Sequence, residues 1–476
     1  MISPVWQGHI ELLWRVDSMH TSSVHSLSLV ENGGRFDASF HLSEGIAVKR
    51  YISKSPYSLT TIGDVSSSIF YGNRAKRVYV TKEENGIPFL SSSDILQSDI
   101  SSVKLASKKY TTSKEQLKLD KGWILISRSG TIGNTAWTNS IHAQKLASED
   151  VIRVVPNNEL QGGFVYAYLT TKYGYSLLTQ GTFGAVIQHI EPDFVASIPI
   201  PVFPESFRKQ VNELINESAC LREKANDALL SAKRVLNEFL SIDFTKQAFK
   251  TAIVSSKDIL SSLQERIDPP ALINDGVGTM TSLISSKPYK RIGEIKATVH
   301  RPGIFKRCYV KEGIPYIKGS EIFLMNPFLR CEQLSRTKTP FVDEMALKEG
   351  QILITCAGSV GCIKMITKEY EDKRAIGSQD IIRLMSQDVL YTREYLFTYL
   401  QLPFVYEYIQ SMKYGSVIER IEPFHVESIP VIEPSKEISQ QITALIRQYM
   451  DYTYRAFNAE ETAIKLVEHE IESWNS

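Results

Sequence analysis

Two adjacent cationic residues occur twice in the chain in almost the same surroundings. Lys76 and Arg77 stand in KRVYV, and Lys306 and Arg307 stand in KRCYV. A lysine offers a point charge and an arginine a planar fork of N–H donors, and both suit phosphate oxygens. We therefore predict that these four residues contact a nucleic-acid backbone, with a solvated surface loop as the alternative.

Two glycine-containing turns offer hydroxyl and backbone N–H groups to a similar ligand. ISRSGTIG carries Arg128, Ser129 and Thr131, and ITCAGSVG carries Ser359. Such groups can form an anion-binding concavity, although a turn that only covers a sheet uses the same residue types. Because Cys356 replaces Arg128 in the second copy, Arg128 is also a candidate for reading a base edge.

A third pair of candidates follows a glycine in each copy. GAVIQHIEP contains Gln188, and GSVIERIEP contains Arg420. Glutamine can pair with adenine and arginine with guanine. Capping of the following helix is the simpler explanation, so both interpretations stay open.

The residue patterns that catalysis would require are not found. Asp268–Ala271 reads DPPA and lacks the aromatic residue that would stack on a flipped adenine. The sequence contains no phosphate-binding G-x-x-x-x-G-K-[ST] loop. Its five cysteines form no C-x-x-C pair, and no cluster of histidines stands at zinc-ligand spacing. We expect no catalytic residue, no metal site and no cofactor in this chain.

The candidates recur because one plan occurs twice in the chain, about 230 positions apart. The matched segments are Arg35–Asp37 with Arg266–Asp268, Gly86–Ile95 with Gly313–Ile322, Gly122–Gly133 with Gly350–Gly361, Ser148–Arg153 with Ser378–Arg383, and Gly184–Pro199 with Gly415–Pro430. A period this long indicates two whole domains. A pseudo-two-fold molecule can present two related surfaces to a pseudo-two-fold ligand, and duplex DNA is such a ligand.

Within each copy, apolar runs predict an α+β domain. Trp123–Ser127 and Gln351–Thr355 read as buried strands that end at glycine pairs. Phe164–Leu178 and Glu394–Met412 are apolar at helical spacing and read as helices. Proline-rich segments, IPIPVFP and IPVIEP, then end the copies as extended chain.

A long heptad pattern follows each proline-rich segment and predicts a helix of about 35 residues, or ~50 Å. The residues expected to pair the two helices are Leu214, Leu221, Ala225, Ala228, Ala232, Leu445, Tyr452, Ala456, Ala459 and Ala463. Their central alanines would allow close approach. We predict antiparallel pairing within one molecule, and the alternatives are packing on the adjacent domain or on another chain.

These patterns divide the chain into four parts. We predict target-reading domains at 1–205 and 251–434, the second with a linker at 251–265, and helical spacers at 206–250 and 435–476. Spacers of ~50 Å would hold the domains ~15 base pairs apart along a duplex.

Composition adds little about the ligand. The 476 residues are 43% hydrophobic and 22% charged, which is typical of a globular protein. A net charge of +1 gives no bulk signal for nucleic acid, and it leaves open a protein scaffold without a DNA role. The N-terminal residues lack a secretory pattern and no apolar run could span a bilayer, so we expect a cytoplasmic protein without membrane contact.

In its order of motifs, from the R-[FI]-D opening through GIP-[FY]-[LI] and the glycine turn to the proline-rich segment and long helix, all twice, the chain resembles the specificity subunit of type I restriction-modification systems. The resemblance extends from about Arg35 to the C-terminus, and the first ~30 residues contribute nothing to it.

The resemblance implies two target-recognition domains that each read half of a bipartite, asymmetric DNA sequence. It implies a non-catalytic subunit that joins two DNA methyltransferase subunits and, in the full complex, ATP-dependent restriction subunits. S-adenosylmethionine, Mg²⁺ and ATP would then act only in those partners. The alternatives are a methyltransferase-only or type II-like system, or a methyltransferase that carries its own specificity.

Overall fold

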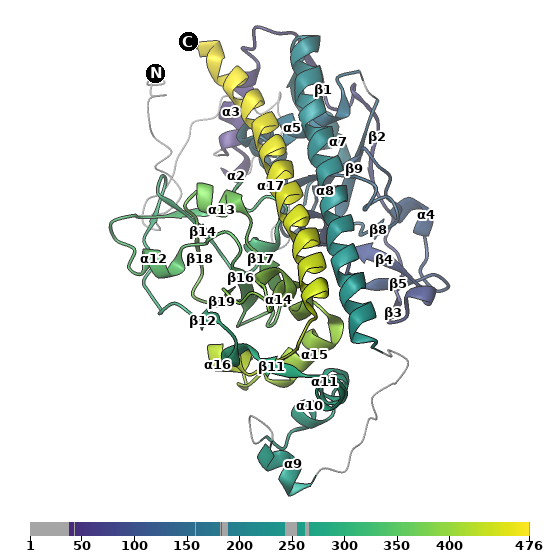
Figure 1. The fold of residues 1–476 in the computed structure, drawn as a ribbon. Helices are drawn as coiled ribbons and strands as arrows, with labels where there is room; N and C mark the ends of the chain where they lie inside the picture. Colours follow the sequence, from purple (N-terminus) through teal and green to yellow (C-terminus); the bar gives the residue numbers. More distant parts are fainter. Residues whose placement is uncertain are drawn as a thin grey trace.

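The fold is an α+β domain that occurs twice, with two long helices between the copies (Figure 1). This computed structural model describes residues 38–41, 43–157, 159–180, 182, 189–242, 255–261 and 266–475. The Arg35–Asp37 motif, the N-terminal ~30 residues and Gln188 lie outside the described residues.

The first domain contains two four-stranded sheets, with strand orders β2-β9-β6-β7 and β3-β5-β4-β8, and a separate β1–β10 pair. Its strands are β1 Leu59–Thr61, β2 Ser66–Tyr71, β3 Tyr79–Val80, β4 Gly86–Leu90, β5 Leu105–Ser107, β6 Ile124–Ser127, β7 Thr135–Trp137, β8 Leu146–Ala147, β9 Val151–Pro156 and β10 Pro199–Pro201. Its helices are α2 Ala38–His41, α3 Glu44–Ile52, α4 Lys114–Leu117, α5 Gly162–Thr170, α6 Lys172–Gln180 and α7 Pro192–Ala196.

The second domain repeats this topology as β12-β19-β16-β17, β13-β15-β14-β18 and a β11–β20 pair. Its strands are β11 Tyr289–Arg291, β12 Ala297–His300, β13 Tyr309–Val310, β14 Ile314–Ile317, β15 Glu332–Leu334, β16 Ile352–Thr355, β17 Ile363–Met365, β18 Ile376–Gly377, β19 Ile381–Ser386 and β20 Pro430–Ile432. Its helices are α10 Pro269–Leu272, α11 Asp275–Ser286, α12 Val342–Met345, α13 Lys368–Asp372, α14 Arg393–Leu400, α15 Pro403–Ser411 and α16 Pro423–Glu427, and α9 Ser256–Ser261 precedes them. The two-domain architecture predicted from the repeat is confirmed.

The apolar runs at 123–127 and 351–355 form the buried strands β6 and β16, as predicted. Each strand pairs antiparallel with neighbours on both sides. The turns that follow have φ of +72° at both Gly130 and Gly358, and +78° at Gly133 and +83° at Gly361. A side chain would be strained at such angles, so these glycines allow the chain to reverse directly after a buried strand.

The predicted helices 164–178 and 394–412 are each broken into two. In the second domain Pro403 begins α15, because its ring removes a backbone donor and cannot continue α14. In the first domain Thr171 takes an extended ψ of 162° between α5 and α6. Its hydroxyl donates to Tyr168 O at 2.6 Å and accepts from the backbone N–H of Gly174 at 3.1 Å.

The long helices are α8 Glu205–Leu240 and α17 Lys436–Glu472, of 36 and 37 residues and therefore about 55 Å each. They lie side by side and run in opposite directions (Figure 1). The start of α8 and the end of α17 complete the core of the first domain, and their other ends complete the core of the second. The predicted intramolecular, antiparallel arrangement is confirmed.

Small residues lie at the centre of this helix pair. Ala225, Ala228, Ala232, Ala456, Ala459 and Ala463 are buried, as is Leu221. Close approach allows the Ser218 hydroxyl to donate to Ala456 O of the other helix at 2.8 Å. Leu214, Leu445 and Tyr452 are only half-buried, whereas Ile215 and Ile446 are fully covered. None of the described helices has both the length and the apolar character of a membrane span.

The two domains also touch directly, through a contact that we call the interdomain bridge. Gln97 and Leu324 form an isolated antiparallel β-bridge just after the 3-10 helices η2 Asp94–Leu96 and η4 Glu321–Phe323. Ser98 N–H donates to Phe323 O at 2.7 Å, and Met325 N–H donates to Leu96 O at 2.9 Å. Ser98 is equivalent to Met325 in the repeat, and Leu96 is equivalent to Phe323, so the second hydrogen bond repeats the first with the domains exchanged. The contact therefore has the pseudo-two-fold symmetry of the repeat.

Candidate nucleic-acid interface

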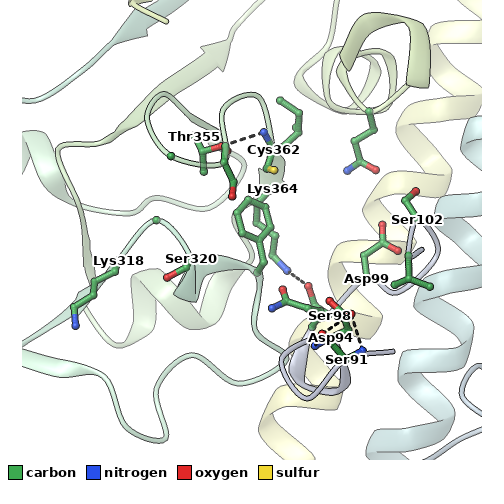
Figure 2. Close-up of a pocket in the computed structure, with 18 of the residues that line it drawn as sticks. Ser91, Asp94, Ser98, Asp99, Ser102, Lys318, Ser320, Thr355, Cys362 and Lys364 are labelled. Carbon is green, nitrogen blue, oxygen red and sulfur yellow. Dashed lines mark hydrogen bonds between the residues drawn. The ribbon is translucent and has the colours of Figure 1, made fainter. Parts of the chain in front are cut away.

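A cleft of about 1070 Å³ lies between the two domains (Figure 2). Its lining includes equivalent residues from both copies: Arg77 with Arg307, Tyr79 with Tyr309, and Phe89 with Tyr316. Leu229 of α8 and Tyr449 of α17 also line it. The cleft therefore presents two related surfaces to a single ligand.

Among the charged side chains that line the cleft, cations outnumber anions. They are Arg77, Lys104, Arg307, Lys318 and Lys364, with Asp94, Asp99 and Asp380. Lys364 is 6% exposed and donates across the domain boundary to the Ser98 hydroxyl at 2.8 Å (Figure 2). Burial lowers the pKa of Lys364 because it disfavours the charged amine. This lysine therefore joins the domains within the wall of the cleft.

The recurring arginines occupy matching places but have different partners. Arg77 pairs with Glu149 at 3.1 Å and lies over the Phe89 ring. Arg307 donates to the Tyr316 hydroxyl at 2.9 Å and to the side-chain oxygen of Gln379 at 3.0 Å. Glu149 and Gln379 are equivalent in the repeat, so Arg77 pairs with a carboxylate where Arg307 has a neutral amide.

A second kind of arginine contact is made from a different sequence position in each domain. Arg128, in the turn after β6, lies over the Tyr71 ring, pairs with Glu191 and donates to Ile190 O at 3.1 Å. The equivalent of Arg128 is Cys356, and burial raises the pKa of its thiol to about 11.

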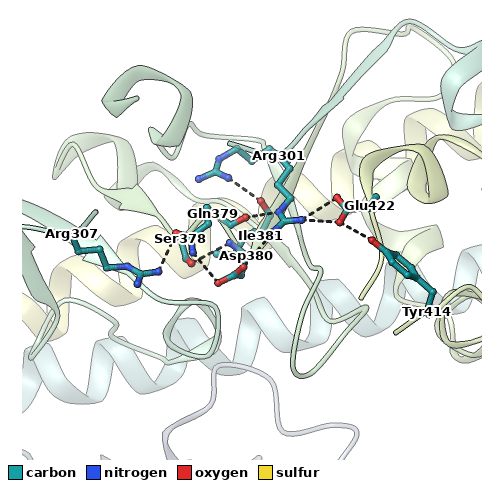
Figure 3. A network of polar contacts seen from close by, with 9 residues as sticks. Arg301, Arg307, Ser378, Gln379, Asp380, Ile381, Tyr414 and Glu422 are labelled. Atoms are coloured by element: carbon teal, nitrogen blue, oxygen red, sulfur yellow. Dashed lines mark hydrogen bonds and ion pairs between the residues drawn. The ribbon is translucent and has the colours of Figure 1, made fainter. Parts of the chain in front are cut away.

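In the second domain Arg301 makes the contact that Arg128 makes in the first. Arg301 stands at the position equivalent to Tyr71. It donates to both carboxylate oxygens of Glu422, the equivalent of Glu191, at 2.9 and 3.0 Å (Figure 3). Each arginine anchors the segment that leads into α7 or α16. A base contact by Arg128 would therefore require its ion pair to open.

The other predicted site residues are spread over both domains. Lys76 and Lys306 are exposed beside the cleft-lining arginines, and Ser359 lines the cleft itself. Arg420 forms backbone bridges with Tyr414 and with Ala357, which lines the cleft. Ser129 and Thr131 lie in the β6–β7 turn of the first domain, where the Ser127 hydroxyl donates to Thr131 O. The structure thus gathers Arg77, Arg307 and Ser359, and places Ser129 and Thr131 apart from them.

Another recurring arginine is structural. Arg153 and Arg383 are 0% and 1% exposed, and both donate to backbone carbonyls: Arg153 to Ser148 and Ala147, and Arg383 to Ile381 and Gly377. Burial lowers the pKa of each guanidinium to about 10. Recurrence of a cation therefore does not by itself indicate contact with a ligand.

Sequence reasoning missed the exposed tyrosine pair in the cleft. Tyr79 is 48% exposed and Tyr309 is 49% exposed, on β3 and β13. Both stand in the repeated motifs that contain the Lys–Arg pairs, so the signal was present in KRVYV and KRCYV. Exposed aromatic residues beside cations are typical of surfaces that bind nucleic acid. No cluster of metal-ligating side chains occurs among the described residues.

Comparison with known proteins places this architecture in a family. The family model described as "Type I restriction modification DNA specificity domain" matches residues 55–213 and again residues 286–466. The two matches cover most of the chain and coincide with its two copies, so the chain belongs to this family and carries the domain twice. The resemblance identified from the sequence is confirmed.

Solved structures of such subunits are also similar to this chain. One is the S subunit of a type I restriction-modification system from M. genitalium, with 12% identity and a TM-score of 0.35 over 87% of this chain and 96% of that one. Another is the HsdS subunit from Thermoanaerobacter tengcongensis, with 14% identity and a TM-score of 0.28 over 89% and 98%. A third, from work on assembly and conformational transition of the type I R-M system, has 15% identity and a TM-score of 0.28 over 88% and 97%. No curated protein matches the chain.

Proposed function

We propose that this chain is a non-catalytic DNA-recognition subunit that reads a bipartite, asymmetric sequence and directs two methyltransferase subunits, and restriction subunits where present, to it. The observation that carries the proposal is the cleft between the domains. Arg77 and Tyr79 of the first domain line it together with their equivalents in the second, Arg307 and Tyr309. The recurring cations would hold phosphates, and residues that differ between the domains would distinguish the half-sites.

Exchange of one domain tests the bipartite reading. Residues 35–205 are replaced by those of another such subunit, while the contacts of this domain with Ala463, Val467 and Ile471 on α17 are kept. The methylome of cells that express the chimaera with its methyltransferase partner should show one altered half-site. A change in both half-sites would contradict modular reading, and methylation without any defined sequence would contradict the function itself.

Insertion of one heptad into each long helix tests the spacing role. Seven residues add about 10 Å and keep the apolar seam in phase, so the unread gap should grow by about three base pairs. The interdomain bridge must open to allow this, because Gln97 and Leu324 are in contact in the native arrangement. An unchanged gap would show that the helices do not set the spacing.

Titration of the purified chain with S-adenosylmethionine tests whether the chain carries its own methyltransferase activity. We expect no binding, because no cofactor-binding motif is found in the sequence. Salt-dependent binding to duplex DNA, expected here, would in turn be inconsistent with a protein scaffold that has no role on DNA.

A further inference from the structure

At two surface positions, the first domain has a charged or polar side chain where the second domain has an apolar one. Arg74 in the segment between β2 and β3 corresponds to Ile304 between β12 and β13, because each lies two residues before the recurring lysine. Ser113, directly before α4, corresponds to Phe341, directly before α12. The first domain is thus cationic and polar at these positions, and the second is apolar.

The backbone that carries these residues is the same in both domains. Ser113 and Phe341 are both left-handed, with φ of +54° and +57°, and each precedes a short helix. Ser107 N–H donates to Val78 O at 2.7 Å, and its equivalent Ser335 donates to Cys308 O at 2.8 Å. The frame therefore does not require a difference in side chains.

The two positions belong to one surface patch in each domain. In the first domain Lys76 N–H donates to the Thr112 hydroxyl at 3.0 Å, so the segment of Arg74 lies against that of Ser113. In the second, a Cβ at Gly303, next to Ile304, would lie 3.7 Å from the Phe341 ring. Both patches adjoin a recurring exposed lysine, Lys76 or Lys306.

Core packing does not explain the apolar residues. Ile304 is 80% exposed and Phe341 is 46% exposed. Arg74 and Ser113 are exposed as well, and Arg74 forms no ion pair with any described residue. Neither side chain belongs to a described hydrophobic cluster, and apolar side chains that gather on a surface mark sites of contact with a ligand.

We propose that this patch is the base-reading surface of each domain, an inference that rests on the proposed function. The recurring Lys76 and Lys306 fix the phosphate backbone, and the side chains that differ beside them meet base edges. The fork of Arg74 matches O6 and N7 of guanine, whereas Ile304 and Phe341 suit the apolar methyl of thymine. The two halves of the target therefore differ in guanine and thymine content where these patches dock.

The test makes one patch resemble the other. Ile304→Arg with Phe341→Ser gives the second domain the residues of the first, and serine already occupies the equivalent left-handed position. The full chain with its methyltransferase partner selects duplexes from a library with randomised bases, and the bound fraction is sequenced. We expect a changed preference in one half-site only, with a loss of ~5- to 100-fold in discrimination at the affected base.

Lys306→Ala is the matched control. It should weaken binding to all duplexes alike and reduce the dependence on salt, without changing the selected bases. The reciprocal exchange, Arg74→Ile with Ser113→Phe, should alter the other half-site.

Three results would overturn the proposal. If the patch variants select the wild-type sequence in both half-sites, the bases are read elsewhere and the proposed function still stands. If the variants lose the methyltransferase subunit while the chain alone selects the same bases, the patch is a protein-docking surface. If the wild-type complex itself selects no bipartite sequence, the proposed function fails and the base-reading patch fails with it.

Discussion

Three kinds of arginine, distinguished by their partners, occur in both domains, and the partner decides what each arginine can contribute. Arg153 and Arg383 are enclosed by backbone carbonyls, Arg128 and Arg301 each hold a glutamate, and Arg77 and Arg307 face the cleft. Only the last pair combines recurrence with a position on the surface shared by both domains. The side chain that contacts each arginine then determines how much of its charge is available to a ligand.

Substitution at Glu149 should change the contribution of Arg77 to DNA binding. Glu149→Gln gives Arg77 the kind of partner that Arg307 has, and frees a charge that is now paired at 3.1 Å. We expect tighter binding to duplex DNA at low salt and a slope of log K against log salt that is steeper by up to ~0.9. The matched variant Gln379→Glu should have the opposite effect through Arg307. Equal salt slopes in wild type and both variants would show that neither arginine contacts phosphate.

Removal of Glu460 should destabilise the junction between the first domain and the helices. Glu460 is 2% exposed, accepts from the Tyr166 hydroxyl at 2.6 Å and pairs with Arg222 of α8 at 2.9 Å. Glu460→Ala leaves a largely enclosed arginine without its carboxylate, at a cost of ~3–5 kcal/mol. Urea unfolding of the full chain should show a lower midpoint.

The control is Asp451→Ala, which removes an exposed pair with Arg455 on the same helix and should cost less than ~1 kcal/mol. Similar midpoints for the two variants would show that the buried contact to Tyr166 and Arg222 does not hold the junction together.

At the scale of elements, the helix pair depends on small side chains at its centre. Ala232 on α8 and Ala463 on α17 are both 0% exposed. Heptad spacing identified the pair and its alanines, but an ideal helix drifts relative to a seven-residue repeat. Near the ends Ile215 and Ile446 are fully covered, and the predicted Leu214 and Leu445 pack half-buried against the same cores.

A larger residue at this centre should weaken the pair. Ala232→Leu forces extra volume into a closed interface and should cost ~1–3 kcal/mol. Ala444→Leu is the control, because Ala444 is exposed on α17 and a leucine there meets solvent. Thermal unfolding of the two variants compares them directly. Equal stability would mean that the helices can separate at Ala232 without cost.

At the scale of the whole molecule, the interdomain bridge and the helix pair together hold the domains in one arrangement. The bridge residues form a non-hydrogen-bonded antiparallel pair, whose Cα atoms are expected ~4.5 Å apart. That separation suits a disulfide. Gln97→Cys with Leu324→Cys should therefore form an intramolecular bond under mild oxidation. In the chain-entropy account this bond adds up to ~5 kcal/mol to the free energy of unfolding, so the unfolding midpoint should rise.

The effect of this bond on DNA binding tests the arrangement itself. We expect the oxidised chain to bind duplex DNA as the reduced chain does, because Arg77 and Arg307 already line one cleft in the bridged state. Single-cysteine variants under the same oxidation are the controls, since five native cysteines are present. Loss of binding only in the cross-linked chain would show that the domains must separate around DNA.

The sequence by itself determined the duplication, the buried strands β6 and β16, the glycine turns and the long helices. These features depend on local spacing and on backbone angles that few residue types accept, so they can be recognised along the chain.

Only the tertiary structure decided which cations face a common cleft, which are enclosed and which are neutralised. Arg77, Arg128 and Arg153 are chemically alike in the sequence, and their roles differ because segments distant along the chain bring Glu149, Glu191 or the Leu117 carbonyl beside them. The interdomain bridge likewise joins residues that no local pattern connects, because long-range contacts depend on how the two domains pack against the helices.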